Sequence, residues 1–269
     1  LIGVAPPGGK MPEEWLDIIY KAVVKDIKVI NGLHIKLSKL DRFQDIDVNK
    51  IIDLRYSYIP KNVAHGKAAE LNKNVILTVG SDCASGKMTT ALELHRDCLR
   101  RGLKSDFIPT GQTGMYIAGK GFAIDAVISD FMAGAIEEFV CESAENNSDY
   151  IFVEGQGSIL HPAYSGVTLG LIHGSAPNII VFAHDISRSK LAYFGKEIPS
   201  LKEQIDIVER LAGYQRQCKV LGISLFAAGI EKSELDEIIY EMEMEYRIPV
   251  FAPLVTGCGK FIDILEEYR

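Results

Sequence analysis

The sequence predicts an α/β fold in which a mostly parallel sheet is covered by helices on both faces. Two observations carry this prediction. Short and almost continuously apolar stretches, typical of buried strands, alternate along the chain with helical stretches. This order is typical of parallel sheets, because each crossover helix covers one face of the sheet. The 269 residues, 47% of them hydrophobic, are enough to bury a sizeable core.

The first part of the chain has a looser pattern than the rest. Its predicted elements are a strand at 1–5, a helix opened by Pro12 at its first helical position, and strands at 27–34 and 51–55. A polar, uneven linker follows at 56–73. We therefore predict a domain boundary near residue 70, with a partial first domain at 1–70 and a second domain at 71–269.

After the linker the alternation becomes regular. Apolar stretches predict six further strands, at 75–80, 105–111, 149–157, 178–184, 219–225 and 248–253. A helix from Lys87 to Arg101 ends at Gly102, which is a good C-terminal cap. Other helices are predicted at 122–144, from Ser200 through Leu211 with Glu203 completing a capping box, and from an N-cap at Ser233 to Tyr246.

Composition and charge argue against several classes of protein. The net charge of −7 is unfavourable for a nucleic-acid partner, which requires dense lysine and arginine. No apolar run reaches the length of about 20 residues that spans a membrane, and no signal peptide is visible. Five widely spaced cysteines without a CxxC pair indicate reduced thiols. We therefore expect a cytoplasmic protein, and the absence of an initiator Met leads us to expect missing upstream sequence.

The segment TVGSDCASGKMTT at 78–90 has the form of a phosphate-binding loop, or P-loop. It follows a predicted buried strand, turns through glycines and enters a helix. Glycine lets the backbone curl so that N–H groups point inward, and the helix adds its positive dipole end. Lysine supplies a mobile cation for phosphate oxygens. The residues expected to hold phosphate are Gly80, Ser81, Asp82, Cys83, Ala84, Ser85, Gly86, Lys87, Met88, Thr89 and Thr90.

Two positions in this loop leave alternatives open. Met88 stands where such loops carry a Ser or Thr for magnesium, and a thioether is not a useful ligand for that hard cation. Thr89 or Thr90 substitutes if the loop is shifted; otherwise the loop holds phosphate without a tightly bound metal, and we predict no metal site. Loop N–H groups are expected to lower the pKa of Cys83 and favour its thiolate, although a small residue that fits a tight turn also explains it.

A second polar cluster follows the predicted strand that ends at Glu154. Four apolar residues lead into this acid, which predicts a position at the edge of the sheet beside the loop. Partial burial raises a carboxyl pKa toward neutrality, so Glu154 is a candidate general base; the alternative is a structural acid paired with Lys87. His161 is a second candidate base. Gln156 is a candidate donor to an oxyanion.

Further polar side chains are candidates for substrate binding. Gln112 and Thr113 offer neutral hydrogen-bonding groups in a predicted loop at 109–121. Ser165 belongs to a long predicted loop after Glu154, rich in hydroxyls and imidazoles, which we expect to act as a substrate lid. Arg188 follows another strand and is suited to bidentate binding of a substrate carboxylate, with a surface charge at a helix start as the alternative.

Several segments in this order resemble the D-glutamate N-acetyltransferase-like family, which was long catalogued as a domain of unknown function. They are APPGGKMPEEW, NGLH, GSDCASGKMTTALEL, GQTG, VEGQGS and HPAYSGVTLGLIHGS. The resemblance covers the chain from about residue 3 to about residue 230. It implies a P-loop C-terminal domain and a Rossmann-like N-terminal domain, of which this chain contains only the later part.

The resemblance implies a reaction of D-amino acid metabolism, the transfer of acetyl from acetyl-CoA to the amine of D-glutamate. The loop would then hold the diphosphate of coenzyme A without a catalytic magnesium. One alternative is a ligase or kinase that uses ATP with Mg²⁺ and resembles dethiobiotin synthetase, with Glu154 and Thr89 sharing the metal. A third reading is a nucleotide-gated regulatory or scaffolding protein. We expect a small-molecule amino-acid substrate, no nucleic-acid or membrane partner, and a homo-oligomer.

Overall fold

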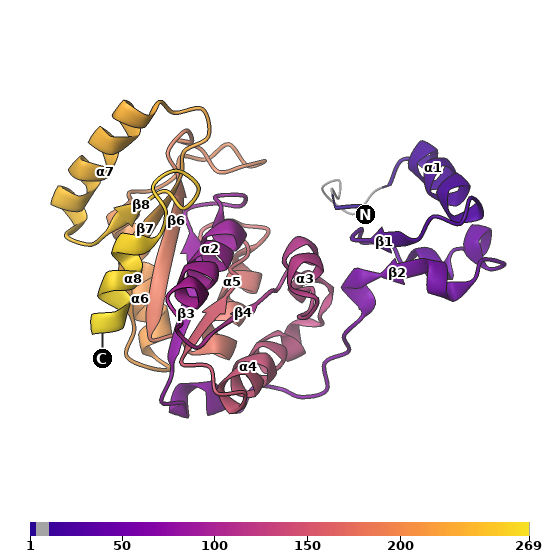
Figure 1. The fold of residues 1–269 in the computed structure, drawn as a ribbon, viewed down its shortest axis with the longest axis horizontal. Coiled ribbons are helices and arrows are strands. Elements are labelled where there is room, and N and C mark those ends of the chain that lie inside the picture. Colours follow the sequence, from indigo (N-terminus) through magenta and orange to yellow (C-terminus); the bar gives the residue numbers. More distant parts are fainter. Residues whose placement is uncertain (4–10, 269) are drawn as a thin grey trace. The chain divides into compact units, whose positions relative to one another are not determined.

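The computed structural model describes residues 1–3 and 11–268 (Figure 1). Contacts divide the chain into two compact units. The first unit combines Leu1–Ile59 with Pro109–Ile128, and the second combines Pro60–Ile108 with Ser129–Arg269. The division after Ile59 comes earlier in the chain than the boundary that the sequence predicts near residue 70. The sequence pattern also does not reveal that a segment from the middle of the chain joins the first unit.

The second unit is built on a six-stranded sheet, and all neighbouring strands are parallel. The strand order is β4-β5-β3-β6-β7-β8. The strands are β3 (Asn74–Gly80), β4 (Ser105–Ile108), β5 (Tyr150–Val153), β6 (Ile179–Asp185), β7 (Lys219–Phe226) and β8 (Val250–Phe251). The parallel sheet predicted from the alternation of strands and helices is therefore confirmed.

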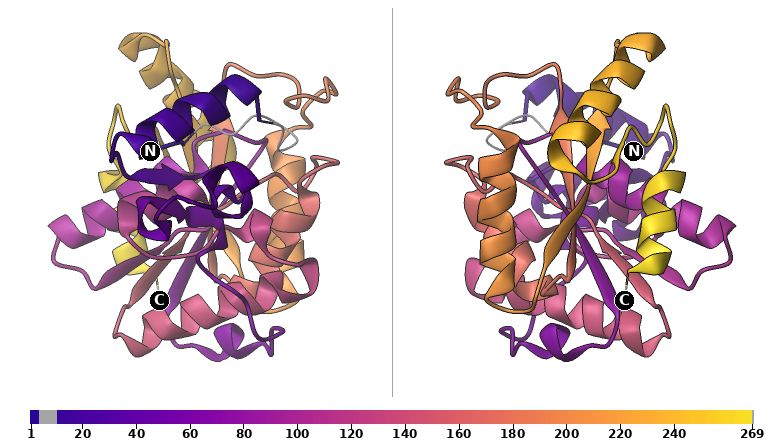
Figure 2. Two further views of the ribbon diagram at one scale, coloured as in Figure 1. Left: turned by 90° about the vertical axis from the view of Figure 1, so that its right-hand side faces the viewer. Right: turned by 90° about the vertical axis from the view of Figure 1, so that its left-hand side faces the viewer.

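Helices cover both faces of this sheet. They are α2 (Lys87–Arg100), α4 (Ser129–Glu145), α5 (Ser165–Ser175), α6 (Leu201–Gly213), α7 (Lys232–Tyr246) and α8 (Gly259–Glu267). Figure 2 shows α2 and α8 on one face and α5 and α6 on the other, while α4 packs against α5. No helix within the described residues is both long and apolar enough to cross a membrane.

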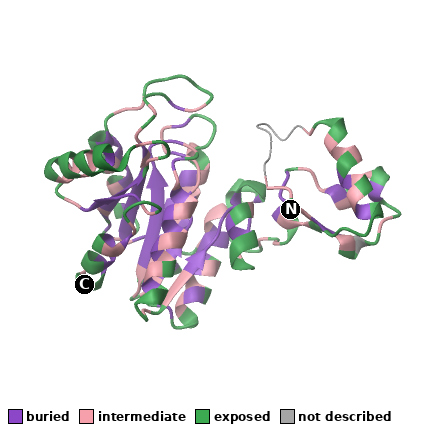
Figure 3. Ribbon diagram, turned by 45° about the horizontal axis from the view of Figure 1, so that its top comes forward, coloured by how far each residue is buried: buried purple, intermediate pink, exposed green. Residues whose placement is uncertain are grey.

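The core of the second unit lies between the sheet and α2 with α8. Ile76 and Phe107 from the strands meet Leu94 from α2 and Phe261 from α8, and all four are buried. The strands are buried on both faces, as the purple arrows in Figure 3 show. Burial on both faces explains why these strands read as continuous apolar runs instead of an alternating pattern.

The first unit is a small α/β unit. Its elements are α1 (Glu13–Val24), the parallel pair β1 (Val29–Asn31) and β2 (Ile51–Asp53), and α3 (Gln112–Ala118), with short 3₁₀ turns between them. The buried Arg55 connects the two stretches of chain that form it. Its guanidinium donates to the carbonyl oxygen of Gly32 at 2.7 Å and to Oε1 of Gln112 at 2.9 Å, and it forms an ion pair with Asp125.

Several predicted elements are wrong in this region. The helix predicted at 122–144 begins only at Ser129, because the buried Phe122, Ile124 and Val127 belong to the stretch Pro109–Ile128, which is part of the first unit. Residues 112–118 form α3, where the sequence predicts a loop. Of the strand predicted at 1–5, Ile2 forms a parallel bridge with Asn31, Leu1 and Gly3 are not in a strand, and residues 4 and 5 lie outside the described residues.

Two further corrections concern the second unit. The loop predicted as a substrate lid contains α5, a helix whose Thr168 and Ser175 are buried, so this part is a fixed element of the fold. The acidic helix α7 begins at Lys232 with Glu231 at its N-cap, so Ser233 is not the cap. The predicted cap at Ser200 is confirmed, since its hydroxyl accepts a hydrogen bond from the backbone N–H of Glu203.

A pair of glycine substitutions in α5 tests its close packing on α4. A Cβ at Gly174 would overlap the carbonyl oxygen of Ala133 and approach the Ala133 Cα to 2.8 Å. Gly174→Ala is therefore expected to destabilise the protein by about 2 kcal/mol or more, because backbone atoms must move apart. At Gly166, in the same helix, a Cβ meets nothing within 4 Å.

Gly166→Ala serves as the matched control and is expected to leave stability unchanged or raise it by up to about 1 kcal/mol through helix propensity. Urea unfolding followed by circular dichroism measures both variants. Equal stabilities for the two variants would contradict the packing described for α4 and α5.

Candidate active site

The loop between β3 and α2, residues 80–87, closes tightly because glycine occupies two of its positions. A Cβ at Gly80 would overlap the Ser85 hydroxyl and approach the carbonyl oxygen of Ala183 to 2.8 Å. Gly86 has a φ of +89°, a left-handed conformation that glycine adopts at little cost. The chain therefore curls before it enters α2, and the amino end of that helix faces the loop. This is a backbone arrangement that can receive an anion.

The carboxylate of Asp82 organises the loop. It is fully buried, and its Oδ1 accepts a hydrogen bond from the backbone N–H of Cys83 at 2.7 Å. Its Oδ2 accepts from the backbone N–H of Ala192 at 2.6 Å and from Arg188 at 3.4 Å. Arg188 also donates to the carbonyl oxygen of Cys83 at 2.8 Å and pairs with Asp185 at 2.9 Å. Asp82 thus joins the loop to the segment that follows β6.

Lys87 lies buried under the same loop. Its Nζ donates to the carbonyl oxygen of Asp82 at 2.6 Å and to the Ser85 hydroxyl at 3.3 Å. Burial lowers the pKa of Lys87 from 10.5 to about 8, although the negative charges of Asp82 and Glu154 oppose this change. The ammonium therefore loses its proton at a lower pH than an exposed lysine does, and a bound anion would favour its charged form.

The residues after the lysine decide where a metal ligand could stand. Met88 packs against the core cluster of the second unit, so its side chain is part of the hydrophobic packing. The buried Thr90 hydroxyl bonds to the carbonyl oxygen of Gly86 at 3.0 Å and to the Ser224 hydroxyl at 2.7 Å. Thr89 lines a pocket beside the loop. Of the two threonines that the sequence left open as magnesium ligands, Thr89 has the more accessible position.

Glu154 follows β5 and lies close to the loop. The backbone N–H of Gly155 donates to the Thr78 hydroxyl at 2.9 Å, and a Cβ at Gly155 would overlap the Thr78 carbonyl oxygen. The chain after β5 therefore presses directly against β3. This brings the buried Glu154 near enough for its charge to act on the pKa of Lys87. Both interpretations of Glu154, as a base and as a structural partner of the lysine, agree with this position.

His161 is buried and has a hydrogen-bond partner at each ring nitrogen. Its Nε2 donates to the carbonyl oxygen of Ala192 at 2.9 Å, and its Nδ1 accepts from the backbone N–H of Ala163 at 3.2 Å. These partners select the neutral tautomer with the proton on Nε2. His161 also stacks on Tyr164, with ring centroids 4.7 Å apart. To act as a base, the imidazole must first release the Ala163 N–H from Nδ1, which is its one acceptor nitrogen.

The other residues of this segment are held by the start of α5. The carbonyl oxygen of Gln156 accepts a hydrogen bond from the Thr168 hydroxyl at 2.8 Å. Ser165 is the first residue of α5, and its backbone N–H donates to the carbonyl oxygen of His161 at 3.0 Å. The roles predicted for Gln156 and Ser165 remain predictions, on a backbone that is well fixed.

The thiol of Cys83 does not have the depressed pKa that the sequence suggested. Burial raises the pKa, and this outweighs the positive charge of Lys87. The sulfur, one Asp82 oxygen and one His161 nitrogen lie within 4.8 Å of one another, a spacing that could hold a metal ion. The Asp82 and His161 atoms already form hydrogen bonds within the protein, so we assign no metal to this cluster.

Sequence reasoning gave no role to His184, which the structure places beside the loop. Its Nδ1 shares a hydrogen bond with the Ser81 hydroxyl at 2.9 Å, and the Ser158 hydroxyl donates to the Ser81 carbonyl oxygen at 3.2 Å. Burial lowers the pKa of His184. The position of His184 at the carboxyl end of a predicted parallel strand could have indicated that it lies near the site.

Gln112 and Thr113 lie in the first unit, at the start of α3. The Gln112 Oε1 accepts from Arg55, and its Nε2 donates to the carbonyl oxygen of Gly3 at 3.4 Å. Thr113 is exposed. Gln112 therefore helps to close the first unit, and substrate binding by either residue remains a prediction.

An apolar pocket of about 130 Å³, also missed in the sequence, adjoins the loop in the second unit. The loop contributes Gly86 to its lining, and the first turn of α2 contributes Thr89. The other walls come from the carboxyl ends of β7 and β8, namely Phe226, Ala227, Ala228, Pro253, Leu254 and Val255. An apolar pocket at the strand ends, next to an anion-binding loop, suits a flat ring attached to a phosphate.

The lowered pKa of Lys87 gives an expectation for stability against pH. The folded state releases the lysine proton near pH 8, whereas the unfolded state keeps it until about pH 10.5. Between these values the unfolded state binds more protons, so the stability of the parent protein should rise with pH relative to Lys87→Met. Urea unfolding of both proteins at pH 7, 8.5 and 10 measures this difference. A constant difference would mean that Lys87 keeps an ordinary pKa; exposed Lys232→Met is the control.

Comparison with known proteins agrees with this architecture. Residues 62–262 match the model of a domain described as the DUF1611 C-terminal P-loop domain, and residues 1–57 match the DUF1611 N-terminal Rossmann-like domain. A crystal structure of a DUF1611 family protein from Anabaena variabilis is 35% identical with a TM-score of 0.94, covering 99% of this chain and 79% of the other.

Two curated relatives carry the name D-glutamate N-acetyltransferase. The protein from Tritonibacter scottomollicae is 35% identical over 98% of this chain and 80% of its own length. The protein from a Pseudoalteromonas species is 33% identical over 97% of this chain and 79% of its own length. The resemblance predicted from the sequence motifs is therefore confirmed, and the chain belongs to the DUF1611 family.

Proposed function

We propose that this protein is an N-acetyltransferase that transfers acetyl from acetyl-CoA to the amino group of an amino acid, with D-glutamate as the first candidate. The observation that carries the proposal is the similarity over nearly the whole chain to two proteins named D-glutamate N-acetyltransferase. The loop geometry supports it independently, because the site is suited to an anionic co-substrate that carries a flat ring.

The loop and its neighbouring pocket suit the nucleotide end of coenzyme A. The amino end of α2 and Lys87 would bind the diphosphate through N–H groups and an ammonium. The apolar pocket between the ends of β7 and β8 would receive the adenine. Binding must first release Lys87 Nζ from the carbonyl oxygen of Asp82 and the Ser85 hydroxyl.

The residue after Lys87 agrees with a reaction in which no phosphoryl group moves. Met88 is part of the hydrophobic packing, so the position that ordinarily presents a hydroxyl to magnesium supplies none. Acetyl transfer needs the diphosphate to be held, not cleaved. A loop without that hydroxyl can perform this task.

The chemistry requires a base and a group that stabilises negative charge. The amine nitrogen attacks the thioester carbonyl, a tetrahedral oxyanion forms, and its collapse releases the coenzyme A thiolate, which takes up a proton. We propose Glu154 as the base that accepts the ammonium proton, with His161 as the second choice. Gln156 is proposed to donate to the oxyanion, and Arg188 to bind the substrate carboxylate with help from Ser165. Gln112 and Thr113 are separate candidates for substrate binding in the first unit.

These roles set a geometric requirement. The thioester lies at the far end of the pantetheine arm from the diphosphate. Because Glu154 is close to Lys87, the arm must turn back over the edge of the sheet for Glu154 to act on the amine. Arg188 must likewise exchange Asp82 or Asp185 for the substrate.

The same position of Glu154 favours one alternative function. An acid beside the lysine of a phosphate-binding loop can share a magnesium ion with a hydroxyl such as that of Thr89, as a ligase or kinase using ATP requires. The two functions differ in their need for magnesium and in the ligand bound. The need for magnesium and the choice between acetyl-CoA and ATP can both be measured on one preparation of the protein.

The experiment combines calorimetric titration with an assay of turnover. Acetyl-CoA is expected to bind with equal affinity with and without magnesium, and Lys87→Ala is expected to weaken binding by about tenfold or more. With D-glutamate added, mass spectrometry should detect N-acetyl-D-glutamate. Glu154→Gln should lower kcat by about 10²-fold or more with little change in acetyl-CoA affinity, because it removes a base and not the anion site.

Tight binding of ATP that requires magnesium, with no affinity for acetyl-CoA, would overturn the acetyltransferase and support the ligase. Turnover with L-glutamate or another amino acid, but not with D-glutamate, would keep the reaction and correct the acceptor. Unchanged kcat in Glu154→Gln would remove Glu154 as the base and direct attention to His161.

A substitution at the apolar pocket tests whether it receives the adenine. Ala228 lines the pocket and is exposed, so Ala228→Trp should fill it without disturbing the core. This variant is expected to raise KM for acetyl-CoA by about tenfold and leave KM for the amino acid unchanged. Ser233→Trp, at an exposed position of α7, is the control for the added indole. Equal KM values for the two variants would place the adenine elsewhere.

A further inference from the structure

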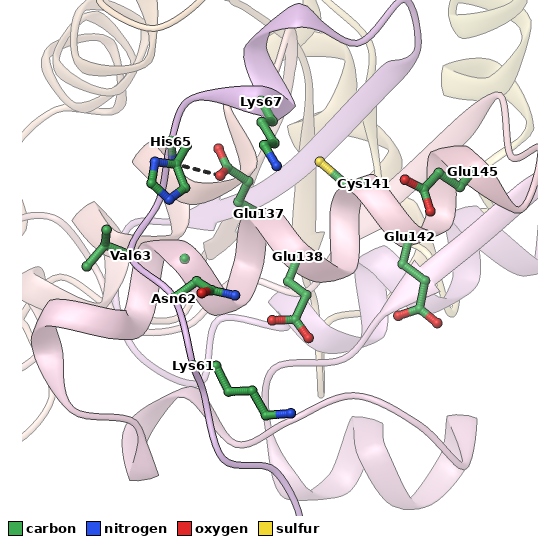
Figure 4. Close-up of a pocket in the computed structure, with 11 residues that line it drawn as sticks. Lys61, Asn62, Val63, His65, Lys67, Glu137, Glu138, Cys141, Glu142 and Glu145 are labelled. Atoms are coloured by element: carbon green, nitrogen blue, oxygen red, sulfur yellow. Dashed lines mark hydrogen bonds between the residues drawn. The ribbon is translucent and has the colours of Figure 1, made fainter.

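The second unit contains a groove that the proposed acetyl transfer does not use. It has a volume of about 540 Å³ and lies between the segment 61–67 and α4 (Figure 4). The segment contributes Lys61, His65 and Lys67, and α4 contributes Glu137, Cys141 and three further glutamates. Four glutamates against two lysines give the lining a negative balance.

Close packing of the backbone fixes this groove. A Cβ at Gly134 would overlap the carbonyl oxygen of Asn62 and approach the Val63 carbonyl carbon to 2.8 Å. The segment therefore lies directly on α4, and the next turn of the helix points Glu137 toward the same segment. The Glu137 Oε1 accepts a hydrogen bond from the backbone N–H of His65 at 2.7 Å.

The second oxygen of Glu137 has an unusual environment. The residue is only 5% exposed, and its Oε2 has no hydrogen-bond partner among the described residues. A buried carboxylate oxygen without a partner is costly, because it has lost its water without gaining a donor. The oxygen itself is covered, but its residue lines the groove, so a donor in the groove could satisfy it after a small rotation of the carboxylate.

The remaining acids are arranged along one side of the helix. Glu138, Glu142 and Glu145 follow one another at intervals of four and three residues, which corresponds to about 6 Å and about 4.5 Å along a helix axis. These intervals match a chain of ammonium groups separated by short methylene spacers. Figure 4 shows these three side chains on α4, with Lys61 and Lys67 on the facing segment.

We propose that this groove binds an aliphatic diamine or polyamine, with one terminal ammonium donating to Glu137 Oε2 and a second ammonium lying against the carboxylates of the following turns. A divalent metal ion fits less well, because these carboxylates do not gather at metal-ligand spacing. The described residues contain one such group, Asp82 with Cys83 and His161, and it lies elsewhere.

The two lysines give the proposal a distinctive signature. Both are exposed and carry long flexible side chains, so they can move toward water when a cation enters. Both ammonium groups border the same groove as the carboxylates, so their positive charge opposes the entry of a cation. Removing Lys67 should therefore strengthen the binding of a polyamine, whereas it would weaken the binding of an anion or of a zwitterion such as an amino acid.

The test is calorimetric titration of the full chain with 1,4-diaminobutane and with spermidine at fixed ionic strength. We expect saturable binding of one molecule per chain. Glu137→Gln should raise Kd by about tenfold, because the buried charge is lost while the bond from the His65 N–H can remain. Lys67→Ala should lower Kd by a few-fold. Glu237→Gln, an exposed acid on α7, is the matched control for a change of charge alone.

Glu142→Gln, at an exposed position of the groove, keeps the test decisive if Glu137→Gln does not fold, and it too should raise Kd. Absence of saturable binding would overturn the proposal. Equal effects of the groove variants and Glu237→Gln would mean adventitious cation binding only. Weaker binding in Lys67→Ala would assign the groove to a ligand that carries a negative charge. Acetyl transfer enters none of these readouts, so either proposal can fail alone.

Discussion

The closed shape of the phosphate-binding loop depends on the buried carboxylate of Asp82. A charge removed from water is tolerated only where donors surround it, and here backbone N–H groups and Arg188 supply them. Because these donors come from the loop itself and from the segment after β6, satisfying one carboxylate fixes two stretches of chain together. The carbonyl oxygen of Asp82 accepts a hydrogen bond from Lys87 Nζ, and this contact holds the lysine side chain beneath the loop.

Much of the fold follows from simple patterning. Strands buried on both faces stand out as apolar runs, and the parallel sheet follows from their alternation with helices. The pattern fails where glycines line a helix: α5 contains Gly166, Gly170 and Gly174, so its sequence resembles a loop. Gly174 is required because α4 approaches α5 closely at this position. The residues around Gly174 do not reveal this contact, since the neighbour is a different helix. The prediction of a helix at 122–144 was wrong because this one apolar run is divided between the two units after Ile128.

In the candidate site, too, features set by nearby residues could be predicted from the sequence, whereas features set by residues far along the chain could not. The loop and the acid after β5 could be located from the sequence, since each follows a strand whose end must reach one edge of the sheet. The partners of His161 could not, because one of them is the backbone oxygen of Ala192, far along the chain. For Cys83 the sequence suggested stabilisation of the thiolate by N–H groups, but burial has the larger effect on its pKa.

The ion pair of the buried Arg55 with Asp125 has a consequence for the order in which the protein can fold during synthesis. Arg55 leaves the ribosome before Gln112 and Asp125, and β3, α2 and β4 of the second unit are made in between. The first unit therefore cannot complete its fold when residues 1–59 emerge, because residues 109–128 have not yet been made. Its completion must wait until part of the other unit already exists, so the two units mature at overlapping times. A fragment cut within the linker would retain the arginine and lose both its carboxylate and the amide of Gln112.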